Sequence, residues 1–109
     1  MEKVIIGVGS VALWIRHARS LKDRRQITQS LIQKLKNEGF SATEVDVGEN
    51  FKRALIGFAF CSAEAGLVEN QIERAKRIFV GDFEIVNAKT EYMEMETGFE
   101  LPLIDPLED

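Results

Sequence analysis

The sequence predicts an α+β fold in which two helices cover one face of a four-stranded antiparallel sheet. Residues 4–14 and 54–62 are apolar on both faces, as expected of central strands. Residues 21–38, and those between Ser62 and Gly81, carry apolar side chains at helical spacing. The elements follow the order β-α-β-β-α-β, and 109 residues with 45% hydrophobic content suit one globular domain.

The first half of the chain contains a strand and a well-delimited helix. Residues 4–14 read VIIGVGSVALW and form the first strand. Ser20 is expected to cap the helix by accepting the N–H of Asp23, whose carboxylate can reach back. The helix should cover about 21–38, and Gly39 is expected to adopt the left-handed conformation that ends it. Its apolar stripe consists of Ile27, Leu31, Ile32 and Leu35.

The second strand is expected at residues 42–47, where apolar and acidic side chains alternate. This alternation is typical of a half-buried strand at a sheet edge, and a turn at 48–50 follows it. The alternating residues are Thr43, Val45 and Val47 on one side and Glu44 and Asp46 on the other.

The remaining elements are a second central strand, a helix and a last strand. Residues 54–62 form the central strand, and the helix should open at Ser62 or Ala63 and end at Gly81. The last strand is expected at 83–95. The buried stripe of the helix is Val68, Ile72, Ala75 and Phe79.

This order of elements predicts a ferredoxin-like sandwich as a single domain over residues 1–97. Parallel strands joined by right-handed helical crossovers leave a slot that the hairpin partner fills, and this places the first and third strands at the centre of the sheet. Residues 98–109 read GFELPLIDPLED and form a C-terminal tail. Its prolines exclude a regular helix, so we expect an extended segment whose apolar side chains pack on the domain or on a second subunit.

Charge is divided unevenly along the chain. Residues 1–90 carry a net charge of +3, whereas residues 91–109 carry −7 and contain no Lys or Arg. Such a division suggests an anionic partner for the basic body, or a tail that masks it. A solvated tail that only keeps the protein soluble is the alternative.

The predicted topology collects basic residues at one end of the sheet. The first strand-to-helix loop, the hairpin after the second strand and the loop after the second helix meet there. The N-terminus of the first helix adds free N–H groups, which favour anions. Arg24, nearer the apolar stripe, should reach over the sheet end. The candidate anion-binding residues are Arg16, Arg19, Lys22, Arg25, Lys52 and Arg53.

The face of the sheet without helices is a candidate interface. Val8, Ala12 and Trp14 alternate to one side of the first strand, and an apolar sheet face of this size usually finds a partner. A symmetric homodimer is the commonest solution, so the sequence predicts a homodimer through these residues.

Catalytic, metal and targeting signals are not recognisable in the sequence. It has one cysteine and one histidine, which excludes an internal disulfide and a His/Cys zinc site. We expect Cys61 to be a buried apolar residue, no cofactor, no small-molecule substrate and no catalytic residues. Residues 4–15 are too few to span a bilayer and lack signal-peptide features, so the expected location is the cytoplasm, without membrane contact.

The segment 57–60, Gly-Phe-Ala-Phe, resembles the core of the RNA-recognition-motif signature. In that motif two aromatic side chains stack on bases. The preceding basic residue is replaced here by Ile56, and Cys61 follows Phe60. The sequence therefore favours a core role for Phe58 and Phe60.

A second resemblance covers most of the domain. Residues 20–25, Ser-Leu-Lys-Asp-Arg-Arg, are similar to a motif of the YlxP-like family of small bacterial proteins, and residues 53–62 resemble its third strand. The resemblance implies a ferredoxin-like fold and, through genes often found beside transcription- and translation-factor genes, an RNA-related role. Arg19 stands where the family usually has His, and Ser10, Ala12 and Trp14 make the open face more apolar.

Two functional hypotheses follow. The leading one is a non-enzymatic accessory protein that binds RNA or a ribosomal surface through the basic end. The alternative is a protein-interaction module, a homodimer through the open sheet face, without nucleic-acid binding. Salt dependence distinguishes them, because phosphate contacts weaken steeply with salt and an apolar interface does not.

Overall fold

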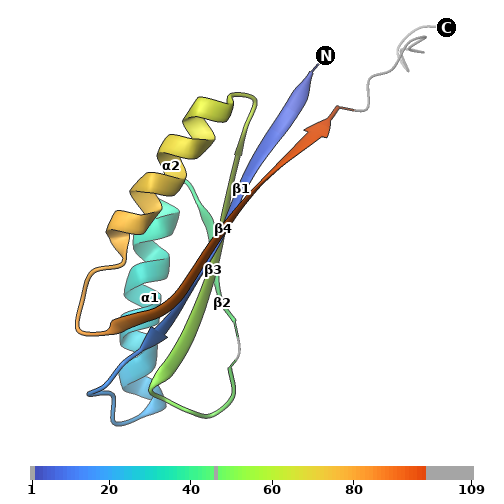
Figure 1. Cartoon of the computed structure of the whole chain (residues 1–109). Helices are drawn as coiled ribbons and strands as arrows, with labels where there is room; N and C mark the ends of the chain where they lie inside the picture. The colour runs from blue at the N-terminus through green and yellow to red at the C-terminus, as the bar shows by residue number, and fades with distance from the viewer. Residues whose placement is uncertain (1, 46, 98–109) are drawn as a thin grey trace, which may run out of the picture.

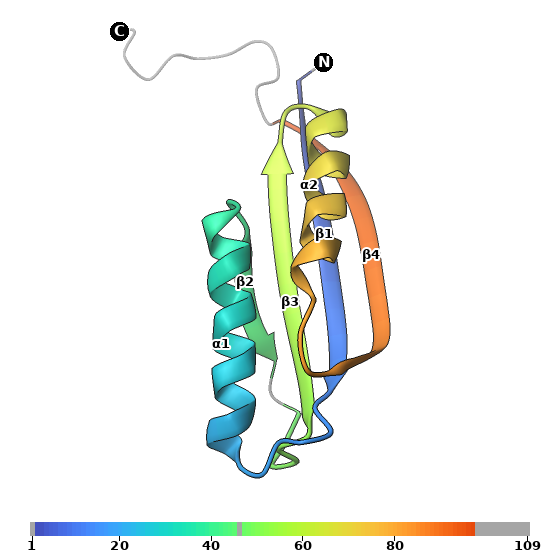
Figure 2. The same cartoon turned by 90° about the vertical axis from the view of Figure 1, so that its left-hand side faces the viewer.

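The computed structural model describes residues 2–45 and 47–97 and confirms the ferredoxin-like α+β sandwich. The described strands form one sheet in the order β2-β3-β1-β4, with antiparallel neighbours throughout, so β1 and β3 are central as expected. Both helices lie on the same face of this sheet (Figures 1 and 2). The elements are β1 (Lys3–Trp14), α1 (Leu21–Asn37), β2 (Ser41–Val45), β3 (Arg53–Ser62), α2 (Ala65–Ile78) and β4 (Glu84–Glu96).

The C-terminus of α1 follows the prediction. Gly39 has a φ of +93°, the left-handed conformation that glycine adopts without a Cβ penalty. Its N–H donates to the carbonyl of Lys36 at 3.0 Å, and the N–H of Phe40 donates to the carbonyl of Leu35 at 3.0 Å. These two bonds form a Schellman motif, which satisfies the last carbonyls of the helix and directs Phe40 into the core.

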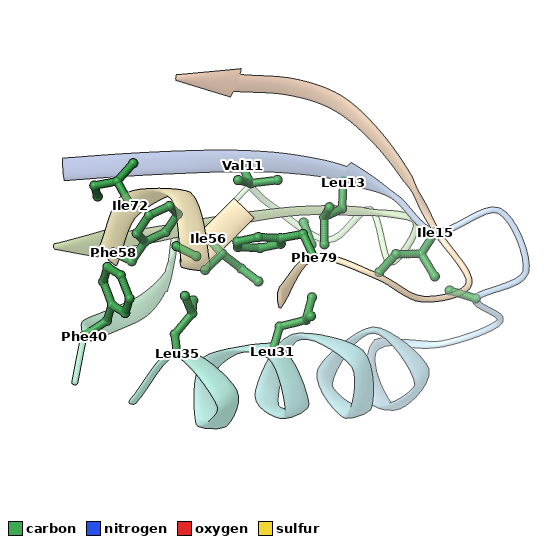
Figure 3. Close-up of a cluster of buried hydrophobic side chains, with 13 residues drawn as sticks. Val11, Leu13, Ile15, Leu31, Leu35, Phe40, Ile56, Phe58, Ile72 and Phe79 are labelled. Carbon is green, nitrogen blue, oxygen red and sulfur yellow. The ribbon is translucent and has the colours of Figure 1, made fainter. Parts of the chain in front are cut away.

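The core lies between the helices and the sheet (Figure 3). Phe58 is central to it: its ring lies 5.5 Å from that of Phe40, edge to face, and 5.8 Å from that of Phe79. The predicted stripe of α2 is fully or almost fully buried, as are Leu31 and Leu35 of α1. The apolar spacing of both helices thus identified the faces that pack on the sheet.

Two glycines of β1 make room for these side chains. A Cβ on Gly7 would lie 2.8 Å from Cγ1 atoms of both Ile72 and Val68, and a Cβ on Gly9 would lie 2.2 Å from Cζ of Phe58. Both glycines are buried on the helix side of the strand. The Gly-x-Gly pattern of this strand therefore reflects close packing.

The boundaries of α2 differ from the prediction at both ends. The helix begins at Ala65 instead of Ser62 or Ala63, because β3 continues to Ser62, whose hydroxyl accepts the N–H of Glu64 at 3.2 Å. It ends at Ile78, before Gly81, because the N–H of Val80 donates back to the carbonyl of Ile78 at 2.8 Å. A turn, not a glycine, thus ends this helix.

β2 is an edge strand as predicted, but it is shorter, and its apolar side faces away from the helices. Ala42 and Glu44 lie on the side of α1 and are half-buried, whereas Val45 is 41% exposed on the open face. An alternation of apolar and acidic side chains by itself favours burial of the apolar side, which is the opposite orientation. Tertiary contacts of Glu44, described below, reverse it.

β4 forms the other edge and is exposed along its whole length. All 13 of its residues are exposed, because α2 lies over β1 and β3 rather than over β4 (Figure 2). Its pairing with β1 contains one bulge, where Ala12 opposes Asn87 and Leu13 opposes Ile85, so that Val86 has no opposite residue. The expectation for the tail, residues 98–109, lies outside the described residues.

Candidate nucleic-acid interface

The three expected connections meet at one end of the sheet, which Figure 1 shows at the bottom of the molecule. At this end Trp14 of β1 lies between Arg53 of β3 and Glu84 of β4. The N–H of Ile15 donates to the carbonyl of Lys52 at 2.7 Å and fastens the first loop to the hairpin. The prediction that the topology gathers these loops is therefore confirmed.

The N-terminus of α1 opens at this end. Ser20 is the N-cap, and its hydroxyl accepts the N–H of Asp23 at 3.2 Å, as predicted. The Asp23 carboxylate accepts the N–H of Arg19 at 2.9 Å, one residue before the N–H that a capping box uses. The bond from the Arg19 N–H to Asp23 fixes the backbone of Arg19 immediately before the helix. The Arg19 side chain therefore extends from a fixed backbone position.

Arg24 is buried and holds the hairpin against the helix. Its side chain reaches over the sheet end as predicted, and the residue is only 8% exposed. One terminal nitrogen, Nη1, donates to the carbonyls of Gly48 and Asn50, both at 3.2 Å. Nε lies 3.3 Å from the Glu44 carboxylate, whose other oxygen accepts the hydroxyl of Thr28 at 2.9 Å. Arg24 is therefore a structural residue that joins α1, β2 and the hairpin.

The six candidate cations occupy the surface around this clamp. Five are exposed, and Lys52 is half-buried. Among the described residues, ion pairs are absent for Arg19, Lys22, Arg25, Lys52 and Arg53. Arg16 differs, because its guanidinium forms an ion pair with Glu84. Within this ion pair, Arg16 also donates a hydrogen bond to the Glu84 carboxylate. This hydrogen bond, and next the Coulomb attraction of Glu84, raise the pKa of Arg16. Part of its charge is thus already matched within the chain.

The structure divides the candidate cations between two sides of the sheet. Lys22 and Arg25 lie on the solvent-facing side of α1. Arg53 lies on the open face, because its neighbour Ala54 is buried toward the helices and Trp14 stands beside it. A ligand that contacts all of them must therefore pass over the end of the sheet. A chain-like polyanion meets this requirement more easily than a small anion does.

A hollow of about 390 Å³ lies between α1 and the hairpin at this end. Arg25 and Glu49 are both at its surface, so its charge is mixed. Phosphates approaching Arg25 from the solvent side of α1 avoid Glu49, whereas a small anion inside the hollow does not. Its lining residues are Leu21, Arg24, Arg25, Glu44, Gly48 and Glu49.

The open face carries the candidate interface residues, in differing degrees of exposure. Val8 is 38% exposed, whereas Ala12 and Trp14 are half-buried. Trp14 borders a hollow of about 120 Å³ together with Arg53 and the bulge residue Val86. Side chains of this chain thus already cover part of the predicted interface.

Two sequence interpretations on β3 have different outcomes. Phe58 is buried and Phe60 packs against the core on the helix side, so both have the predicted core role. In the RNA recognition motif the stacking aromatics face away from the helices, and these do not. The prediction for Cys61 is wrong, because Cys61 is exposed on the open face opposite Ile6. The strand is apolar on both faces, but helices cover only one of them.

Sequence reasoning missed a pair of charges on β4. Lys89 and Glu91 border a shallow hollow of about 190 Å³ on the open face, above Val8 and Ser10 of β1. They stand two residues apart and therefore on the same face of the strand. The sequence contained a signal, because Asn87, Lys89 and Glu91 stand at alternate positions of the last strand and so share one face.

Fold and surface together define a small α+β domain of ferredoxin-like topology with one cationic end. A family model described as a protein of unknown function, DUF503, matches residues 6–92, and the chain belongs to this family. The description does not include the YlxP-like name, so that resemblance stays a prediction.

Solved structures with a similar backbone have little sequence in common with the chain. A de novo designed protein named Foldit4 is 12% identical, with coverage of 88% of this chain and 99% of that one and a TM-score of 0.41. A putative PII-like signalling protein from Thermus thermophilus is 10% identical, with coverage of 88% and 94% and a TM-score of 0.46. A de novo design with a ferredoxin fold is 13% identical, with coverage of 100% and 96% and a TM-score of 0.39.

No curated protein matches the chain. In the described part of the chain, no helix has the length and apolar character needed to cross a membrane.

Proposed function

We propose that this protein is a non-enzymatic accessory factor that binds RNA, free or on a ribosomal surface, through its basic end. The observation that carries the proposal is the set of basic side chains around the N-terminus of α1 for which the described residues offer no ion pair. These are Arg19, Lys22, Arg25, Lys52 and Arg53. Cations that are not matched within a chain are available to phosphates.

Local energetics support the proposal. Lys22 and Arg25 lie in the first turns of α1, where the helix dipole disfavours positive charge by a few tenths of a kcal/mol each. A sequence under selection for stability alone favours acids at these positions. The resemblance to the YlxP-like family adds an RNA-related context by association. Lys22 and Arg25 would contact phosphates with Lys52 and Arg53, and Arg16 and Arg19 would assist.

The test compares two charge reversals on the same helix. K22E/R25E removes the proposed contacts, and K34E/K36E makes the same change in net charge at the other end of α1. Binding of a fluorescent poly-uridine oligonucleotide is measured by anisotropy over a series of salt concentrations. K22E/R25E should abolish binding at low salt, or lower the salt slope by about 1.4, since each single-strand phosphate contact contributes about 0.7.

The control variant shows whether a loss of RNA affinity is specific to the basic end or follows from the change in net charge. K34E/K36E should retain most of the affinity, because Lys34 and Lys36 lie at the far end of the helix. Equal losses in both variants would attribute binding to net charge alone and contradict a site at the basic end. Unchanged affinity in K22E/R25E would refute the phosphate contacts directly.

The second candidate function is a protein-interaction module that forms a homodimer through the open sheet face. The observation in its favour is the exposure of apolar side chains there, with Val8 at 38% and Met93 at 54%. Such a dimer would be nearly insensitive to salt, because apolar burial is not screened.

A further inference from the structure

The outer edge of β4 is the largest unpaired backbone surface of the described chain. β4 pairs with β1 on one side only, and its 13 residues are exposed on both faces. Alternate residues of an edge strand direct their N–H and C=O groups outward, where another strand can bind them. Between Asn87 and Met93 the strand contains no proline and no bulge, two features that block such pairing. Its charged residues, Lys89 and Glu91, disfavour pairing unless each meets an opposite charge.

Charges along β4 are not distributed at random. Glu96, the last residue of the strand, has no ion pair among the described residues. Glu84 is paired with Arg16, and Glu94 lies 3.4 Å from Nζ of Lys3, so contacts within the chain already match these two acids. Lys89 and Glu91 lie between them without an ion pair among the described residues. Among the described residues, the central segment of β4 therefore contains one cation and one anion that no ion pair matches.

Twofold symmetry restricts how two β4 strands can pair. A two-fold axis perpendicular to the sheet makes the strands antiparallel and keeps each side chain on its own face. Directly opposed residues must therefore come from the same face. An axis at Lys89 would oppose two lysines, and an axis at Glu91 would oppose two glutamates, which is unfavourable. An axis at Thr90 opposes each Lys89 to Glu91 of the other copy, twice.

We propose that a second copy of this chain binds along the outer edge of β4, antiparallel, with Thr90 on the two-fold axis. The occupant is a second copy because the two unmatched charges complement each other only under this symmetry. Asn87–Met93 of each copy would pair without interruption, since the bulge at Val86 lies outside that segment. The result is an eight-stranded sheet.

This arrangement also covers exposed apolar surface. Tyr92, 47% exposed, would oppose Ala88 on the helix side, and Met93, 54% exposed, would oppose Asn87 on the open face. The helices of both copies would lie on one face, and the two basic ends would point in opposite directions. The proposal therefore goes beyond the proposed RNA-binding function and does not depend on it.

A single cysteine tests the position of the axis. In a C61A background, T90C places two cysteines opposite each other, with Cα atoms about 4.5–5.5 Å apart, a separation that allows a disulfide. The matched control is N87C/C61A, whose cysteines would be about 20 Å apart at 3.3 Å per residue. After mild oxidation, non-reducing electrophoresis should show a covalent dimer for T90C and not for N87C.

Charge reversal tests the register independently. K89E and E91K each create two like-charge pairs, and either should raise the dimer dissociation constant roughly tenfold in analytical ultracentrifugation. K89E/E91K exchanges the charges and should restore the wild-type value. Recovery in the double variant cannot come from a loss of stability, because both substitutions remain present.

Each alternative gives a different result. A monomer at tens of micromolar overturns the proposal, as does equal cross-linking of T90C and N87C. A dimer that withstands the β4 charge changes but is dissociated by V8E assigns the contact to the open face. A monomer that dimerises only after deletion of residues 98–109 assigns the edge to the chain's own tail. Either of the last two results also overturns the proposal.

Discussion

The two edge strands of the sheet differ in length and in whether a helix covers them. β2 is five residues long and lies under α1, with Glu44 turned inward to a buried arginine. β4 is 13 residues long, lies under no helix and is exposed throughout. Both edges belong to the same sheet and border central strands of similar length. The difference in exposure therefore arises from where the helices lie.

Two local features determine this asymmetry. On one side, Arg24 binds Glu44 and the carbonyls of Gly48 and Asn50, which fixes α1 over β2. On the other side, Gly7 lets α2 approach the backbone of β1, so α2 lies over the centre of the sheet rather than over β4. A domain with two helices can thus cover one face of one edge strand and leave the other edge strand uncovered, available for association.

The largest expected effect concerns the β2 edge, which α1 covers on one face. R24A leaves the Glu44 carboxylate mostly buried without its cation and should lower the free energy of unfolding by about 3 kcal/mol, measured by urea denaturation. R24M/E44M should recover most of this loss, because two apolar side chains bury no unmatched charge. The hairpin carbonyls that lose the Arg24 hydrogen bonds belong to exposed residues and can be hydrated.

A loss below about 1 kcal/mol in R24A would contradict this view, since an exposed ion pair contributes no more than that. It would mean that the Arg24–Glu44 pair does not hold the β2 edge. Continued loss in the double variant would attribute the effect to the hairpin carbonyls instead.

The next effect concerns the position of α2. G7A places a Cβ 2.8 Å from side-chain atoms of Ile72 and Val68, so the helix must shift. We expect a loss of about 1–3 kcal/mol in the free energy of unfolding. G57A is the matched control on β3, because a Cβ there meets no atom closer than 3.9 Å and should change stability by less than about 0.5 kcal/mol. Similar losses of stability in G7A and G57A would show that glycines of the strands affect stability for a reason other than the close approach of α2.

The smallest effect concerns the outer side of β2. V45T introduces a hydroxyl at a side chain that is 41% exposed, and the free energy of unfolding should change by less than about 0.5 kcal/mol. A42T introduces the same side chain on the helix side, where Ala42 packs against the core, and should cost about 1–3 kcal/mol. A larger loss of stability in V45T than in A42T would show that the Val45 side of β2 is the one packed under α1, as the alternation of the sequence favours.

The accuracy of the sequence interpretation depended on how local each signal is. Ser20 and Gly39 mark the ends of α1, and both act within one helical turn, so their roles could be read directly. The orientation of Glu44 could not, because it depends on Arg24, 20 positions earlier in the chain. Cys61 was misplaced for a similar reason, since an apolar strand does not reveal which of its faces the helices cover.

The candidate site was predictable in its position but not in its details. The topology brought the loops of the basic residues together, and counting charges identified the cations. The sequence did not reveal that Glu84 matches Arg16, or that Arg53 lies on the other side of the sheet from Arg25. Ion pairs between residues far apart in sequence require coordinates, because many acids could serve each cation.

By itself the sequence determined the order of elements, the central strands, the buried stripes of both helices and the basic end. These follow from periodicity, capping and chain connectivity, which act over a few residues or constrain topology. Only the tertiary structure decided which edge is covered, which face of β2 is buried and which charges remain unmatched. Such choices depend on packing at Gly7 and on the Arg24–Glu44 pair, where residues distant in sequence compete for the same space and the same charge.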